Sequence, residues 1–143
     1  MYVSAILANK GADVVTTRAD TTIGQAVRRL AEKRIGVLVI SNDAKTVNGI
    51  LSERDIVQAL VDKGAQVETA LVSAYMSTDV VTCAPTDTIA SLMALMTERR
   101  IRHLPVIDAG VLAGIVSIGD VVKHRLAEIE SEADALRQYV TQA

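Results

Sequence analysis

The fold of this chain is decided by a stretch that it contains twice. The stretch reads Gly49-Ile50-Leu51-Ser52-Glu53-Arg54-Asp55 in its first copy and Gly114-Ile115-Val116-Ser117-Ile118-Gly119-Asp120 in its second. In both copies two aliphatic residues favour a strand, a serine follows as a helix N-cap, and an aspartate stands three residues later in the first helical turn. Each copy therefore predicts a strand that leads into a helix. The free N–H groups and the positive dipole end at such a joint favour an anion.

The composition describes a small protein with an aliphatic core. The chain has 143 residues, half of them hydrophobic, with no Trp or Phe and three Tyr. A formal net charge of −2 and the absence of a long Lys/Arg run argue against nucleic acid as a partner, because phosphate binding needs a clustered basic face. The single cysteine, Cys83, excludes an intrachain disulfide. No segment is apolar over the roughly 18 residues of a membrane span, and the N-terminus lacks the basic start of a signal peptide, so we expect a cytoplasmic protein.

The predicted helices and strands around this stretch also follow a similar order in the two halves of the chain. The first half predicts a helix at residues 3–9, strands at 14–17, 37–40 and 47–51, and helices that begin after Asp20 and at Ser52. The second half predicts a short helix at 71–76, strands at 80–82 and 103–107, and helices that begin at Asp87 and Ile118. Val14 and Val80 are 66 positions apart, and Gly49 and Gly114 are 65 apart. Nearly equal offsets over several elements indicate an internal duplication.

The last helix is predicted to run to about Tyr139, beyond the end of its counterpart in the first half. Its apolar stripe consists of Ile129, Ala133, Leu136 and Val140. A stripe of this kind on a charged helix needs a partner. Two partners remain open, the domain to which the helix belongs and a second subunit.

The chain resembles the CBS domain family, named for cystathionine β-synthase, and in particular a stand-alone tandem pair. The residues that carry the resemblance are the two joints at 49–55 and 114–120 and the segment His103-Leu104-Pro105-Val106. The resemblance implies an α+β fold in which two βαββα-like repeats, each with a three-stranded sheet, pack about a pseudo-twofold axis. It places one CBS domain at 8–63, another at 72–128, and a helical extension at 129–143.

The resemblance also implies a function. Such pairs commonly bind AMP, ADP, ATP, S-adenosylmethionine or NAD(H) in two clefts between the repeats, and they often associate as dimers. We therefore expect a non-catalytic regulatory homodimer that senses energy or redox state through an adenine nucleotide and acts on a downstream protein partner. The alternative is a ligand-free pair that serves as a dimerisation scaffold through protein contacts only.

The two aspartates of the joints are the first candidates for ligand contact. The carboxylates of Asp55 and Asp120 have the acceptor capacity for both hydroxyls of a ribose, and Ser52 and Ser117 offer a hydroxyl beside a helix N-terminus to a phosphate. The competing interpretation is a capping box, in which each aspartate bonds the amide of its serine and serves helix stability alone.

The residues between serine and aspartate make the two joints unequal. Arg54 adds a cation to the first joint, whereas Gly119, which follows Ile118, removes bulk from the second and lets a phosphate approach the backbone. We therefore predict tighter nucleotide binding at the Asp120 joint, with Arg54 assisting the phosphates from the other half.

Further candidates flank the joints. Those that the resemblance places around the adenine are Thr17, Gly36, Val37 and Leu38 in the first half, and Thr82, Ala84, Arg102, His103, Leu104 and Pro105 in the second. His103 would line the ligand site with a polar side chain or donate a hydrogen bond to a phosphate. The alternative is that it is an ordinary surface residue of its strand. Basic candidates for phosphate are Lys10, Arg34 and Arg100. Cations at the end of a helix also suit its dipole, which explains both arginines without a ligand.

The sequence gives little support to the hypothesis that the protein is an enzyme. Cys83 could act as a nucleophile with His103 or His124 as base, but a thiol after an aliphatic strand is more often buried and inert. The sequence has no metal-ligand spacing, no Walker A motif and no Gly-x-Gly-x-x-Gly motif. We therefore expect no catalytic residues and no metal.

Overall fold

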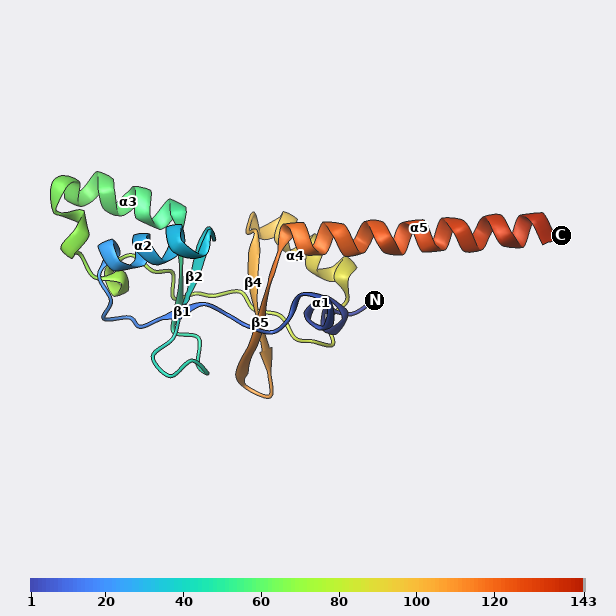
Figure 1. Ribbon diagram of the computed structural model, residues 1–143, viewed down its shortest axis with the longest axis horizontal. Coiled ribbons are helices and arrows are strands. Elements are labelled where there is room, and N and C mark those ends of the chain that lie inside the picture. Colours follow the sequence, from blue (N-terminus) through green and yellow to red (C-terminus); the bar gives the residue numbers. More distant parts are fainter. Residues whose placement is uncertain (143) are drawn as a thin grey trace. The chain divides into compact units, whose positions relative to one another are not determined.

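The computed structural model describes residues 1–142, which form two compact units (Figure 1). Unit 2 contains Asp13–Val81 and Asp108–Ala113. Unit 1 contains Met1–Ala12, Thr82–Ile107 and the chain from Gly114 onward. The N-terminal helix therefore belongs to the unit built by the second repeat, and the segment between the repeats belongs to the unit built by the first.

Unit 2 is built on a three-stranded sheet in the order β1-β2-β3. β1 (Thr16–Thr17) pairs in parallel with β2 (Val37–Ile40), and β2 pairs antiparallel with β3 (Gly49–Ser52), which places Leu38 opposite Leu51. All four residues of β2 are buried. The prediction of a fully buried strand at 37–40 is therefore confirmed, and its central place in the sheet explains why its residues do not alternate.

The helices of unit 2 are α2 (Ile23–Lys33) and α3 (Glu53–Lys63), followed by the 3₁₀ helices η1 (Gly64–Thr69) and η2 (Val72–Ala74). α2 and α3 both pack against η1, and the core consists of Ile23, Ala26, Leu30, Leu38, Ile40, Leu51, Ala59 and Val72. The prediction of a helix at 71–76 was wrong in extent, and η1 was not predicted. Both segments are closed by short i→i+3 bonds, such as Ala70 N–H to Val67 O at 3.1 Å, which apolar periodicity does not reveal.

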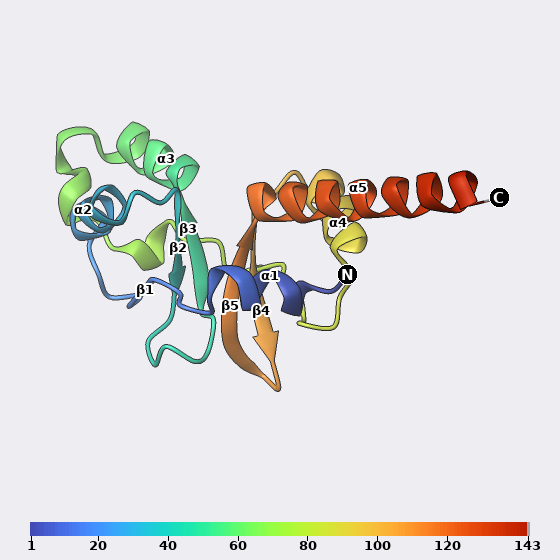
Figure 2. The same cartoon turned by 45° about the vertical axis from the view of Figure 1, so that its right-hand side comes forward.

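Unit 1 contains α1 (Val3–Lys10), α4 (Ile89–Arg99) and α5 (Ile118–Gln142). It also contains the strands β4 (His103–Asp108) and β5 (Val111–Ser117), except for the residues 108–113 at their turn, which belong to unit 2. α1 and α4 both lie against the first part of α5 (Figures 1 and 2). Val3, Ile6, Leu92 and Leu104 are fully buried or nearly so. The buried core of this unit is aliphatic, as the composition predicts.

The sheet of unit 1 has two strands, β4 and β5, and not the three that the resemblance implied. No strand forms at 80–82, and the next residue, Cys83, makes a single parallel bridge to Val106. Pro105 explains the difference. Its carbonyl accepts from the Cys83 N–H at 3.0 Å, but proline has no N–H with which to continue the ladder on that side. Val39 occupies this register in unit 2, where β1 forms.

Candidate functional site

The first joint, in unit 2, is a complete capping box. The Ser52 Oγ accepts from the Asp55 N–H at 3.3 Å, and the Asp55 Oδ2 accepts from the Ser52 N–H at 2.8 Å and from the Ser52 hydroxyl at 3.1 Å. These bonds satisfy two donors at the start of α3 that would otherwise lack partners.

The second joint, in unit 1, repeats this arrangement and adds a lysine. The Ser117 Oγ accepts from the Asp120 N–H at 3.2 Å, and the Asp120 Oδ2 accepts from the Ser117 N–H at 2.9 Å. The Lys10 Nζ lies 2.7 Å from the same Oδ2 and donates to the Ile115 carbonyl at 3.1 Å. Lys10 comes from α1, 110 positions away in the chain. The structure therefore brings together two candidates that the sequence could only list separately.

The Lys10–Asp120 pair is half-buried, with side-chain exposures of 34% and 25%. Burial raises the pKa of Asp120, but the hydrogen bond from Lys10, the Ser117 amide and the charge of Lys10 outweigh it, so the net pKa is lowered. Asp120 is therefore an anion at neutral pH. Both bonds fall on Oδ2, and Oδ1 receives neither of them.

The two joints are anchored to equivalent residues. The Glu53 N–H donates to the Gly36 carbonyl at 3.2 Å, and the Ile118 N–H donates to the Arg102 carbonyl at 2.8 Å. Gly36 and Arg102 therefore hold the starts of α3 and α5 through their backbones. A Cβ at Gly119 would meet only the Ser117 Oγ, at 3.6 Å, so the space beside Gly119 at the start of α5 is open.

Arg34 and Arg100 occupy the same place in the two repeats. Each is the C-cap of its helix in the left-handed conformation, with φ of 55° and 54°. Glycine is the usual residue there because it avoids the Cβ penalty. The C-cap position gives each arginine a place at the end of its helix that does not depend on a ligand. Among residues 1–142, no hydrogen bond connects either arginine to one of the joints.

Several flanking candidates are core residues in this structure. Leu38 and Leu104 are fully inaccessible, Val37 is 7% exposed, and Pro105 is buried. Their side chains fill the units, so they offer a ligand mainly their backbone. His103, half-buried at the start of β4, and Arg102, exposed just before it, remain near the surface of unit 1. Arg54 is the second residue of α3 in unit 2.

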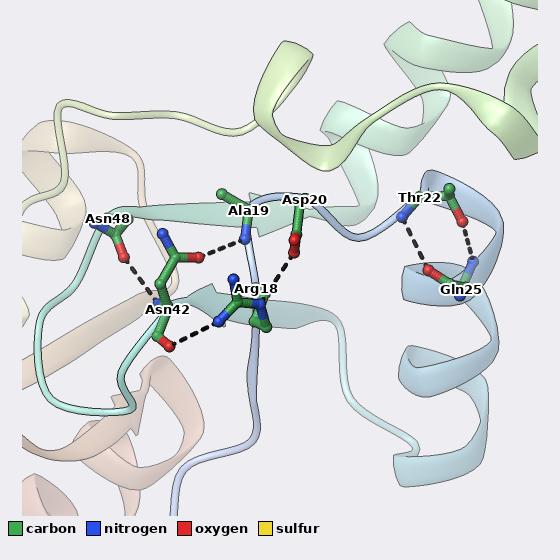
Figure 3. Close-up of polar contacts among 7 residues, drawn as sticks. All are labelled: Arg18, Ala19, Asp20, Thr22, Gln25, Asn42 and Asn48. Atoms are coloured by element: carbon green, nitrogen blue, oxygen red, sulfur yellow. Dashed lines mark hydrogen bonds and ion pairs between the residues drawn. The ribbon is translucent and has the colours of Figure 1, made fainter.

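The loop after β1 is held by Asn42, a residue of the turn between β2 and β3. The Asn42 Oδ1 accepts from the Ala19 N–H at 3.0 Å, and the Asn42 carbonyl accepts from the Arg18 Nη1 at 3.3 Å (Figure 3). Asn48 in turn accepts from the Asn42 N–H at 3.0 Å. This network fixes the loop that begins at Thr17, whose own carbonyl accepts from Ser41. The Ser41-Asn42-Asp43 run was the available signal, since asparagine readily bonds nearby backbone.

In the second repeat, the loop with Thr82 and Ala84 is held differently. The Ala84 N–H donates to the Asp87 Oδ2 at 2.8 Å, and the Asp87 N–H donates back to the Ala84 carbonyl at 3.0 Å. The Thr21 N–H makes the matching bond to the Arg18 carbonyl at 3.1 Å in the first repeat. The two loops therefore share a turn but differ in the side chain that closes it.

A groove of about 560 Å³ lies on the helical side of unit 2. It is lined by Val27, Leu30, Ala31, Arg34, Ile35, Gly36, Glu53, Ile56 and Val57. Arg34 and Gly36 are two of the predicted site residues. The lining is otherwise mostly aliphatic and contains one carboxylate, Glu53, so it is poorly suited to a phosphate.

Cys83 is 6% exposed, and burial together with the negative charge of Asp87 raises its pKa to about 12. The thiol is therefore protonated near neutral pH. We expect an aromatic disulfide reagent at pH 8 to label the native protein about a thousandfold more slowly than the protein in denaturant. Equal rates in the two conditions would contradict both the burial and the raised pKa.

Within residues 1–142, no group of three His, Cys, Asp or Glu side chains could hold a metal ion.

A family model described as "CBS domain" matches the chain twice, at residues 3–62 and 72–127. The chain belongs to the CBS domain family. Its two repeats form a CBS pair, and CBS pairs are in general regulatory modules. None of the described helices is long and apolar enough to cross a membrane.

Similar proteins share most of this pair. The chain is 32% identical over 125 residues to the CBS domain-containing protein CBSX3, mitochondrial, of Arabidopsis thaliana, a match that covers 85% of this chain but only 61% of that relative. The CBS-domain containing protein ATU1752 from Agrobacterium tumefaciens is 44% identical, with a TM-score of 0.82 over 87% of this chain and 92% of that one. The CBS domain pair of protein MJ0100, solved with 5′-methylthioadenosine and S-adenosyl-L-methionine, is 22% identical and has a TM-score of 0.76 over 86% of this chain and 98% of that one. This last likeness concerns the fold.

Proposed function

We propose that this CBS pair binds an adenosine-containing ligand at the joint between β5 and α5, and regulates a partner protein in response to energy or redox state. The observation that carries the proposal is the ionised Asp120 beside Lys10 at the start of a long helix. A carboxylate accepts strongly from the two hydroxyls of a ribose, while an ammonium group and a helix N-terminus stabilise a phosphate. One joint therefore offers a partner for each half of a nucleotide.

The proposed ligands are AMP, ADP, ATP, NAD(H) and S-adenosylmethionine. The adenosine ligands of protein MJ0100 support this chemical class. All the proposed ligands contain a ribose, and this is the part that Asp120 would bind. The first joint has the same capping box, but among residues 1–142 no lysine bonds Asp55, which supports our preference for the second joint. Binding would act on a partner by favouring one arrangement of the protein over another.

A second candidate function is a ligand-free scaffold, and the same ion pair favours it. Lys10 already satisfies Asp120 and reaches the Ile115 carbonyl, so the joint is internally complete without a nucleotide. In this case the pair would act through protein contacts alone. A ligand must compete with Lys10 for Oδ2 of the carboxylate or bond its Oδ1.

Isothermal titration calorimetry with AMP, ATP, S-adenosylmethionine and NADH separates the two functions. We expect saturable heat for at least one of the four, because the proposed regulatory function requires a bound ligand. The scaffold function requires none and predicts no heat of binding. The absence of binding by all four at millimolar concentration would overturn the proposal and leave the scaffold.

A further inference from the structure

α5 carries an apolar stripe along most of its length, and the larger members of the stripe are exposed. Its members are Val122, Leu126, Ile129, Ala133, Leu136 and Val140. The larger ones are exposed, with 55% for Leu126, 46% for Ile129, 63% for Leu136 and 65% for Val140. Both views show the later turns of α5 extending past α4 and α1 (Figures 1 and 2). The family model ends at residue 127, so most of the stripe lies outside the CBS match.

The spacing of the stripe is that of a coiled-coil seam. Successive members are separated by four, three, four, three and four positions, which is a repeat of 3.5 residues. An ordinary surface helix has a wider stripe at a period of 3.6. The register places Leu126, Ala133 and Val140 at one seam position, called a, and Val122, Ile129 and Leu136 at the other, called d. The seam is therefore built for a second helix of the same period.

The charges beside the seam identify a second copy of this chain as that helix. In a parallel pair each g residue meets the e residue five positions later on the other helix. In such a pair Glu132 would face Arg137 of the second copy. Arg125, which bonds Glu128 of its own chain at 3.0 Å, would face Glu130 of the second copy. Both pairs are opposite in charge, and each occurs twice by symmetry.

An antiparallel pair with a fully overlapping seam has the reverse pattern. It would place Glu130 against Glu130, Glu132 against Glu132, and Lys123 against Arg137. Like charges at these positions disfavour that orientation. In the single chain Arg137 bonds Asp134 at 3.2 Å, but both side chains are more than two-thirds exposed, so this contact is weak and readily exchanged.

We propose that the tail of α5, residues 122–142, forms a parallel two-stranded coiled coil with the tail of a second copy. The seam spans less than three heptads, so it forms a reversible dimer rather than a permanent one. This contact does not depend on a nucleotide. It would hold the two copies with the starts of both α5 helices at the same end of the coil.

Disulfide trapping tests the pairing and its orientation together. In a parallel coil the two d positions of one layer face each other, so Leu136→Cys is expected to form a covalent dimer in a glutathione redox buffer at least about tenfold faster than Ser131→Cys. Ser131 lies in the same exposed tail at the outer f position and is the matched control. The native Cys83 is buried and does not compete.

The charge pairs give an independent arm of the test. Glu132→Lys in the Leu136→Cys background would set a cation against Arg137 of the second copy and slow trapping several-fold, and adding Arg137→Glu would restore it. A rate for Leu136→Cys no greater than for Ser131→Cys would overturn the second copy as the occupant of the seam. Trapping that is unaffected by Glu132→Lys would overturn the parallel orientation.

Discussion

Replacing Asp120 with asparagine is expected to weaken the binding of an adenosine ligand roughly 10- to 100-fold, because charge-assisted hydrogen bonds contribute about 1.5–3 kcal/mol. Asparagine has nearly the same shape and retains an oxygen that can accept from the Ser117 N–H, so the capping box survives. What it loses is the negative charge that pairs with Lys10 and that, in the proposed complex, would accept from the ribose. Titration calorimetry with the ligand that gives the strongest heat measures the effect.

The matched control is Asp55→Asn, which makes the same change in a capping box that has no lysine. We expect it to change affinity far less, since the second joint is the proposed site. Equal losses for both variants would mean that the two joints bind alike. A loss for Asp55→Asn alone would move the site to unit 2.

The variant also separates binding from stability. The pKa of Asp120 is lowered in the folded protein, so the stability that its charge contributes is present above the pKa of an unfolded aspartate and is lost as the pH falls through the folded value. The thermal midpoint of Asp120→Asn should therefore lie below that of the wild type at neutral pH and approach it in acid. A lower thermal midpoint with unaltered ligand affinity would instead support a purely structural role for the Asp120 charge.

Replacing Gly49 with alanine is expected to destabilise unit 2 by about 1–3 kcal/mol, the usual cost of overpacking. A Cβ there would lie 2.8 Å from the Met76 sulfur and 2.9 Å from the Ser77 carbonyl oxygen. That carbonyl accepts from the Ile50 N–H at 2.9 Å, and the Ser77 N–H donates to the Ile50 carbonyl at 2.9 Å, so the backbone cannot move away without breaking the bridge. Urea unfolding of the variant and the wild type measures the difference.

Gly114→Ala is the natural comparison, since it makes the same change in the second joint. Its Cβ would lie 2.6 Å from the Leu7 Cδ2, which is the far end of a flexible, half-buried side chain. Leu7 can rotate, so this variant should lose clearly less stability than Gly49→Ala. A greater loss for Gly114→Ala would show that side-chain packing of α1, rather than backbone contact, limits the glycine positions.

Local sequence rules predicted the elements well wherever a few neighbouring residues decide them. Thr22, Ser52 and Thr88 are N-caps, and Gly64 ends α3, all at positions that their residue types favour. The strand at 80–82 failed for a reason that is not local. Its pairing needs an N–H from a strand more than twenty residues away, and that position is Pro105.

The candidate site shows the same division. The sequence by itself determined the duplication, the two strand-to-helix joints and their capping boxes. A serine and an aspartate three residues apart at a helix start form these hydrogen bonds within one helical turn, independently of the rest of the chain. Only the tertiary structure decided that Lys10 reaches Asp120 and not Asp55, and that Asn42 closes the loop after β1. The physical reason is range: a cap is fixed by the backbone of one helical turn, whereas the lysine is carried to the second joint by the packing of α1 on the other repeat's unit.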